Sequence, residues 1–168
     1  MESATQDSQD PRGAIWTIGH SNMSIERFLE LLRAHEIQLL VDVRTMPYSR
    51  HWPQFSRDAL ARSAQADGIA YHFLGRELGG KPDDPALRGP HGLPDYDAIA
   101  ATPLYQEGIK RLTALARERR TAFMCSEGDP AQCHRERLVA RTLRAQGWQV
   151  RHILTDGTIQ QEAQPSLW

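Results

Sequence analysis

The sequence predicts an α/β protein with three layers, in which helices cover both faces of a five-stranded, mainly parallel sheet. Short runs of β-branched and aromatic residues alternate with segments whose apolar residues recur at helical spacing. Residues 39–43 form an apolar run, which is typical of a central parallel strand covered on both faces. With 168 residues and no internal repeat, we expect one domain at 14–156. A disordered N-terminal tail at 1–13 and a C-terminal tail at 157–168 complete this prediction.

The first part of the chain is predicted to contain two strands that flank a helix. Residues 14–19 are β-branched and aromatic and end at a glycine, which indicates the first strand. Ser24 can cap a helix, because apolar residues recur at helical spacing from there to about residue 34. The apolar run at 39–43 is the second strand. The segment 44–55 contains two prolines and is predicted to be a loop.

The middle of the chain is predicted to hold a helix, a strand and a long irregular segment. Ser56 begins a helix that runs to about residue 65 and is stopped by Gly68. Residues 69–74 form the third strand. The segment 75–102 contains four prolines and five glycines, so we expect a loop without regular structure. Loops of this length in compact domains are usually functional lids or locally disordered, and we expect a lid.

The last part of the chain completes the alternation. Residues 105–119 form an amphipathic helix whose basic end suits the helix dipole. A short apolar strand at 121–123 precedes a helix that begins near residue 137, and residues 148–154 form the fifth strand. Five strands thus alternate with four helices, and the crossover connections between parallel strands should be right-handed.

Composition and charge make several classes of protein less favoured. The net charge of −1 provides no general attraction to nucleic acids or anionic membranes. There is no run of about 18 apolar residues, so we expect no membrane span. The two cysteines are eight positions apart, and the polar N-terminus does not resemble a secretory signal. We therefore expect a cytoplasmic protein with free thiols rather than a disulfide framework.

The turn between the fourth strand and the next helix is the strongest candidate site. It contains both cysteines, Cys125 and Cys133, together with Glu127, His134 and Arg135. In a parallel α/β sheet such a turn lies at the carboxyl edge of the strands, where ligands bind. The following helix directs free N–H groups and a partial positive charge into the turn. We expect a thiol there to ionise more easily than a free cysteine.

Residues that follow the other strands should meet this turn, because the carboxyl ends of parallel strands share one edge. The candidate catalytic residues are Cys125, Glu127, His20 and Cys133. The candidate substrate-binding residues are Arg44, His134, Arg135, Ser21, Ser49, Gly79 and Gly80. Structural roles remain as alternatives, because buried cysteines mostly pack as small apolar residues and serines often cap turns.

Several blocks of the sequence occur together in a known order. They are Thr17-Ile18-Gly19-His20-Ser21, Asp42-Val43-Arg44 with Pro47 and Ser49, Leu74-Gly75 with Gly79-Gly80, and Cys125 with Glu127 before Cys133-His134-Arg135. These blocks resemble the uncharacterised family 488 of domains of unknown function. The resemblance covers residues 15–154. It implies little about activity, because the family is named for lacking an assigned one.

A weaker resemblance is to rhodanese-like sulfurtransferases and related cysteine phosphatases. In those enzymes an Asp-Val-Arg strand precedes a strand that ends in a reactive cysteine, and residues 40–44 and 123–125 occupy matching places. An arginine commonly follows that cysteine after a five-residue gap, whereas position 131 here is alanine and the basic residue is Arg135. The resemblance therefore implies a rhodanese-like or Rossmann-like sheet, and the reaction does not transfer with the fold.

Three functions fit these residues. The first is an enzyme acting on a small anionic or phosphorylated substrate, with Cys125 or Cys133 as nucleophile or sulfur carrier. Cationic side chains of the site would hold the anion, while His20 or Glu127 transfers protons. The second is a nucleotide- or nucleic-acid-binding module that also uses the aromatic and cationic loop 44–55. The third is a metal site formed by cysteine and histidine. We expect no cofactor, and the sequence leaves the oligomeric state open.

Overall fold

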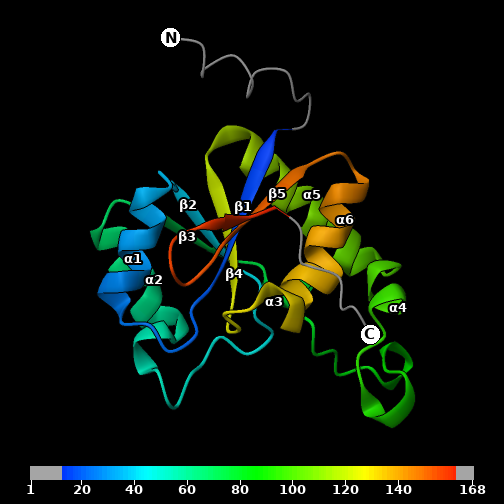
Figure 1. Ribbon diagram of the computed structural model, residues 1–168. Coiled ribbons are helices and arrows are strands. Elements are labelled where there is room, and N and C mark those ends of the chain that lie inside the picture. The colour runs from blue at the N-terminus through cyan, green and yellow to red at the C-terminus, as the bar shows by residue number, and fades with distance from the viewer. Residues whose placement is uncertain (1–12, 162–168) are drawn as a thin grey trace.

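Six strands form one sheet in the computed structural model, which describes residues 13–161 (Figure 1). The strands lie in the order β3-β2-β4-β1-β5-β6. The first five pair in parallel, and β6 pairs antiparallel with β5. Residues 1–12 and 162–168 of the two predicted tails lie outside the described residues. The strands are β1 (Ala14–Gly19), β2 (Leu39–Asp42), β3 (Ala70–Phe73), β4 (Thr121–Cys125), β5 (Gln149–Ile153) and β6 (Ile159–Gln160).

The sheet has one strand more than the five predicted, and the extra strand lies in the segment predicted as a tail. A tight turn after β5 brings β6 back alongside it. The Leu154 N–H donates to the Thr158 carbonyl over 2.9 Å, and Gly157 adopts a φ of +89°. Antiparallel strands need only such a short connection. Because β6 contains two residues, no alternation of apolar and polar residues could mark it in the sequence.

Helices cover both faces of the sheet and make three layers (Figure 1). Helices α1 (Ile25–Ala34) and α2 (Arg57–Ala66) lie on one face, where Phe28 and Leu60 pack with Leu40 and Met124 of the sheet. The other helices pack on the opposite face, around Val41 and Phe123. These are α3 (Gly75–Leu78), α4 (Tyr96–Ala100), α5 (Pro103–Glu118), the π-helical turn η6 (Arg135–Ala140) and α6 (Arg141–Ala145).

The helices begin at residues that satisfy their free N–H groups. The Ser24 side chain accepts a hydrogen bond from the Arg27 N–H over 3.1 Å, as the predicted cap requires. Ser56 directly precedes α2 at the capping position, but its hydroxyl contacts Ser49 and makes no capping hydrogen bond to the helix. Helix α5 begins at Pro103, slightly earlier than predicted, because the Thr102 side chain caps it.

The segment 75–102 contains short helices, which corrects the prediction of a loop without regular structure. Besides α3 and α4 it contains the 3₁₀ turns η3 (Pro85–Leu87) and η4 (Pro90–Gly92). Both turns begin with a proline. Proline is well tolerated at the first helical position, where its missing N–H would have no partner and its φ already suits a helix. The prolines therefore start these turns instead of preventing them.

At the carboxyl end of β4, neighbouring strands lead to helices on opposite faces of the sheet. The chain leaves β1 and β2 toward the face that carries α1 and α2, and it leaves β4 toward the opposite face. Because β4 lies between β1 and β2, the connections diverge on both of its sides. This order differs from the Rossmann order 3-2-1-4-5-6. Ligands of open α/β sheets bind where connections diverge, which places the predicted cysteine turn at a favourable position.

Candidate functional site

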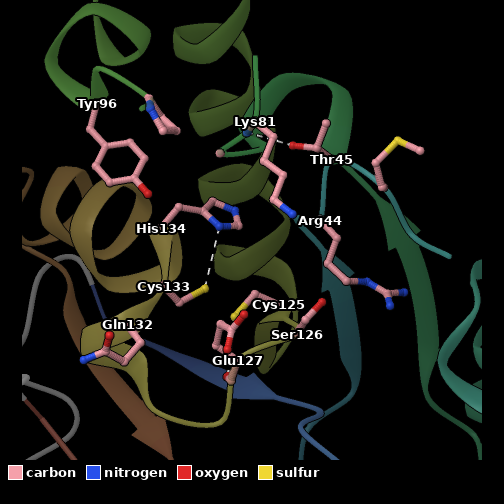
Figure 2. A pocket seen from close by; sticks show the side chains of 13 residues that line it. Arg44, Thr45, Lys81, Tyr96, Cys125, Ser126, Glu127, Gln132, Cys133 and His134 are labelled. Carbon is pink, nitrogen blue, oxygen red and sulfur yellow. Dashed lines mark hydrogen bonds between the residues drawn. The ribbon is translucent and has the colours of Figure 1, made fainter. Parts of the chain in front are cut away.

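A cavity of about 310 Å³ opens at the carboxyl end of β4 (Figure 2). Three segments that are distant in the sequence form its wall: the turn 125–134, the start of the loop after β2, and the segment 80–96. Among the predicted site residues, the cavity is lined by Arg44, Gly80, Cys125, Glu127, Cys133 and His134.

Cys125 is the last residue of β4 and lies at the base of the cavity with 2% of its surface exposed. Burial by itself would raise the pKa of its thiol. A hydrogen bond from the Cys133 thiol, the positive charge of Arg135 and a backbone hydrogen bond at Glu127 outweigh burial and lower this pKa to about 7. Near neutral pH, Cys125 is therefore the cysteine that ionises.

Cys133 lies at the beginning of the next helix and remains a protonated thiol. Its hydrogen bond to Cys125, its burial and the negative charge on Cys125 all raise its pKa. The sulfur also contacts two neighbours: the Arg135 N–H at 3.4 Å and the His134 Nδ1 at 3.6 Å. The two cysteines thus have different protonation states within one hydrogen-bonded pair.

Arg135 lies behind the cavity and does not line it. Its side chain is fully buried and donates to the Thr17 hydroxyl at 2.7 Å and to the Glu127 carbonyl at 2.9 Å. No carboxylate of the described chain lies within ion-pair distance of its guanidinium. A buried charge without a counter-charge is unfavourable, so the nearby Cys125 thiolate is its natural partner. The sequence predicted Arg135 as a substrate-binding residue, and in the structure its guanidinium lies behind the cavity rather than on its wall.

A buried chain of hydrogen bonds holds Arg135 in place. The Thr17 hydroxyl, which accepts from Arg135, lies 2.5 Å from the His152 Nδ1. The His152 Nε2 lies 2.7 Å from a Glu136 carboxylate oxygen, so Nε2 carries the proton and Thr17 donates to Nδ1. Glu136 also pairs with Arg144 near the surface. This chain joins β1, β5 and the π-helical turn, and it orients the guanidinium beneath the cysteine turn.

His134 is an uncharged acceptor rather than the cation that the sequence predicted. Its Nε2 donates to the Val43 carbonyl at 2.9 Å, which leaves Nδ1 unprotonated and directed at Cys133. Burial lowers its pKa to about 4. Gly80 packs directly on the ring, because a Cβ at that position would lie 2.6 Å from the His134 Cβ. Only glycine allows this close approach.

Arg44 is held at the wall of the cavity by a bidentate ion pair with Asp42. Its Nε and Nη2 donate to the two carboxylate oxygens at 2.9 Å and 2.8 Å, and the Tyr71 hydroxyl donates to the same carboxylate. All of these groups are buried or half-buried. Figure 2 shows the guanidinium directed away from the two cysteines. Asp42 therefore positions Arg44.

Besides Arg135, four predicted residues lie outside the cavity. His20 stacks on Phe55 with ring centroids 4.5 Å apart, and burial lowers its pKa to about 4. Its Nδ1 donates to the Ser21 carbonyl at 2.8 Å, so both residues belong to the turn after β1. Ser49 accepts from the Trp52 N–H, as a turn cap does. Gly79 lines a neighbouring cavity of about 550 Å³.

The sequence did not single out Lys81 or Tyr96, which the structure brings to the cavity. Lys81 extends toward the centre of the cavity between His134 and Arg44, and its N–H donates to the Thr45 hydroxyl at 3.1 Å (Figure 2). The sequence did contain an indication of this role, because Lys81 is one of only two lysines and directly follows two glycines. The remaining lining residues are Thr45, Met46, Pro94, Ser126 and Gln132.

The segment 75–102 contributes to the cavity, although through residues other than those expected of a lid. Arg76 and His91 line other hollows of the surface. Arg88 donates to the Pro82 carbonyl within its own loop. Gly80 and Lys81 at one end of the segment, with Pro94 and Tyr96 near the other, form the wall of the cavity. Opening and closing of this segment remains a prediction.

Two further properties bear on the alternatives. Among the residues that the structure describes, no group of three or more histidine, cysteine, aspartate or glutamate side chains is arranged to bind a metal ion. None of the described helices has the length and apolar character needed to span a bilayer.

The fold and the cavity define a mostly parallel α/β protein with a cysteine pair at the carboxyl edge of its sheet. The chain belongs to the family described as domain of unknown function DUF488, whose sequence model matches residues 24–142. This range includes the cysteine turn and the loop after β2, and it begins after residues 17–21. No curated protein and no solved structure shows a significant match to the chain.

Proposed function

We propose that this protein is an enzyme that acts on a small anionic substrate, with the Cys125 thiolate as nucleophile. One observation carries the proposal: Cys125 lies at the base of a cavity, and behind it lies a buried arginine that has no carboxylate partner among residues 13–161. A thiolate is the reactive form of cysteine, and an adjacent cation favours it. In a packed protein interior, this arrangement is unfavourable unless the thiolate or a bound anion balances the charge.

The other groups of the cavity suit this chemistry. The ammonium group of Lys81 provides positive charge inside the cavity, whereas Asp42 balances the charge of Arg44 at the wall. A substrate carrying a carboxylate, phosphate or sulfate would be held by Lys81 while its reactive atom meets Cys125. Glu127 has an exposed side chain at the rim and is the candidate for proton transfer to a leaving group. The covalent step would form a bond between the Cys125 sulfur and the substrate.

Two finer statements belong to the same proposal. We infer a rhodanese-like arrangement of the sheet, which is supported by a cysteine that ends a central parallel strand and precedes a helix. We also infer a cytoplasmic location, because a nucleophilic thiol with a second free thiol beside it requires a reducing compartment.

Alkylation of the thiols tests the proposal. Iodoacetamide should label Cys125 in the Cys133→Ser variant faster than a free thiol near pH 7, because Arg135 still lowers the Cys125 pKa and the serine hydroxyl can replace the hydrogen bond from Cys133. The labelling rate should decrease as the pH is lowered, and sulfate or phosphate should slow it. A rate equal to that of a free thiol, with no effect of these anions, would refute the assignment of Cys125 as nucleophile.

The two lysines provide a matched test of anion binding. Lys81→Met should remove the protection by sulfate, because it takes the ammonium group out of the cavity. Lys110→Met removes the same charge from an exposed position on α5 and should leave protection unchanged. Equal protection in both variants would show that Lys81 does not hold the anion.

A further inference from the structure

The cavity contains two thiols rather than one, and they differ in acidity. Cys125 is stabilised as a thiolate, whereas Cys133 remains protonated, with Cys125 and the His134 Nδ1 both within hydrogen-bonding reach of its single S–H. Both line the same cavity, and Figure 2 shows their sulfur atoms directed toward each other at its base. A nucleophile that only forms a bond with substrate needs one thiol, so the second thiol requires an explanation.

The turn between the two cysteines is rigidly held. The Arg135 guanidinium donates to the carbonyls of Glu127 and Gly128 at 2.9 Å and 3.3 Å. The Ser126 carbonyl accepts from the Ser21 N–H at 2.9 Å. Gly19 lies so close that a Cβ there would be 1.6 Å from the Glu127 carbonyl oxygen. These contacts fix the path of the turn and keep the two sulfur atoms together.

A proton acceptor is placed next to the second thiol. The His134 Nδ1 lies 3.6 Å from the Cys133 sulfur. Since the other ring nitrogen donates to the Val43 carbonyl, Nδ1 is unprotonated and its lone pair can accept the Cys133 proton. Cys133 can therefore lose its proton to His134 when it attacks a neighbouring electrophile. A thiolate, a second thiol in contact with it and an acceptor for the second proton are the three groups that two-thiol oxidation requires.

We propose that the site reduces a hydroperoxide. Cys125 is the thiol that attacks the terminal oxygen and is oxidised, and Cys133 is the thiol that then forms a disulfide with the oxidised Cys125. This second activity uses the Cys125 thiolate of the proposed function, although it does not depend on the anionic substrate.

The depth of Cys125 favours a hydroperoxide over other oxidants. With 2% of its surface exposed, Cys125 favours reagents that are small and need little space for in-line attack. The outer oxygen of a hydroperoxide is terminal and small. A substrate disulfide presents an internal sulfur with substituents on both sides, which makes it bulkier than a hydroperoxide at this buried position.

The two steps balance. The Cys125 thiolate attacks the terminal oxygen, the O–O bond breaks, and the alkoxide or hydroxide that leaves takes a proton from solvent. This step gives a sulfenic acid on Cys125 and an alcohol or water. Cys133 then passes its proton to the His134 Nδ1 and attacks the Cys125 sulfur. The S–O bond breaks, the departing hydroxide takes the proton from His134 to form water, and a disulfide remains. One hydroperoxide is reduced by two electrons, which the two thiols supply.

The test uses the full-length reduced protein and hydrogen peroxide, with tert-butyl hydroperoxide as a second probe. One equivalent of peroxide should remove both thiols and produce an intramolecular disulfide, seen as a loss of two hydrogens by mass spectrometry. The initial rate should exceed that of free cysteine roughly tenfold at pH 7, because about half of Cys125 is thiolate and a few per cent of a free thiol is. Dithiothreitol should restore both thiols.

Single variants separate the two roles, because the chain has only these two cysteines. Cys133→Ser should stop at a sulfenic acid on Cys125 that dimedone traps, and Cys125→Ser should leave Cys133 unoxidised. His134→Asn should slow the appearance of the disulfide more than the loss of peroxide. Circular dichroism confirms that each variant is folded.

The outcomes distinguish this inference from the proposed function. Rapid alkylation of Cys125 without disulfide formation, or a disulfide only between two chains, would overturn the inference and leave the proposed function intact. A disulfide within the chain, together with alkylation that sulfate does not slow, would support the inference and count against the anionic substrate. Oxidation of Cys125 and Cys133 at the rate of free cysteine would overturn the inference.

Discussion

Replacing Thr17 by valine removes a single hydroxyl from the buried chain that supports the cysteine turn. Valine keeps the branched shape, so the change adds almost no cavity. The Thr17 hydroxyl is the partner of two buried groups, the Arg135 Nη1 at 2.7 Å and the His152 Nδ1 at 2.5 Å. Both groups lose that partner in Thr17→Val.

The magnitude follows from the two groups that are left without a partner. A buried polar group without a hydrogen bond costs about 1–3 kcal/mol, and more when it is charged. Thr17→Val should therefore lower the free energy of unfolding by about 2–5 kcal/mol. Because Arg135 is then held less firmly, the pKa of Cys125 should rise, and alkylation of Cys125 at pH 7 should slow.

Urea unfolding, with alkylation rates on the same samples, measures both effects. Thr113→Val is the matched control. Thr113 is also a buried threonine, but its hydroxyl donates only to the Lys110 carbonyl one turn earlier in α5. That control should cost about 1 kcal/mol and leave the alkylation rate unchanged. If Thr17→Val cost no more than Thr113→Val and left Cys125 equally reactive, the buried chain would not be what positions Arg135.

Two further predictions concern pH and the loop 44–55. The free energy of unfolding should fall as the pH is lowered from 7 toward 4, because unfolded histidines bind protons below about 6.5, whereas burial holds the pKa of folded His20 and His134 at about 4. The free energy of unfolding should change by at most about 1.4 kcal/mol per pH unit for each histidine. His20→Gln should remove the contribution of one histidine. A free energy of unfolding that does not change from pH 7 to 5 would contradict this prediction. Tyr48 and Trp52 are 71% and 39% exposed, so a nucleic-acid-binding module would bind labelled single-stranded RNA and weaken steeply with salt. Absence of binding at low salt would eliminate that alternative.

Much of the fold could be predicted from the sequence, because its determinants are local. The apolar run at 39–43 predicted a central parallel strand, and β2 is fully buried between β3 and β4. Ser24 predicted the start of α1, since a cap acts on its own first turn. The short β6 carried no such pattern, and the 3₁₀ turns η3 and η4 of segment 75–102 begin at prolines that also suit a loop.

The sequence predicted where the candidate site lies, but it did not predict which of its side chains carry a charge. Cys125 and Cys133 meet at one cavity because the carboxyl end of a parallel strand and the next helix always adjoin. His134 and Arg135 are adjacent and both basic, yet one is an uncharged acceptor and the other a buried cation. Burial and partners decide the protonation state of a side chain, and neither is visible in the order of residues.

The sequence by itself determined the α/β class, the membership of the family and the turn that carries the two thiols, because periodicity and spacing act over a few residues. Only the tertiary structure decided that Lys81 faces the thiols and that His20 lies outside the cavity. It also decided the acidity of Cys125, which depends on the buried Arg135 and, through it, on Thr17 in β1. Electrostatic and hydrogen-bonding energies depend on distance in space, and β1 and β4 become neighbours only when the sheet has formed.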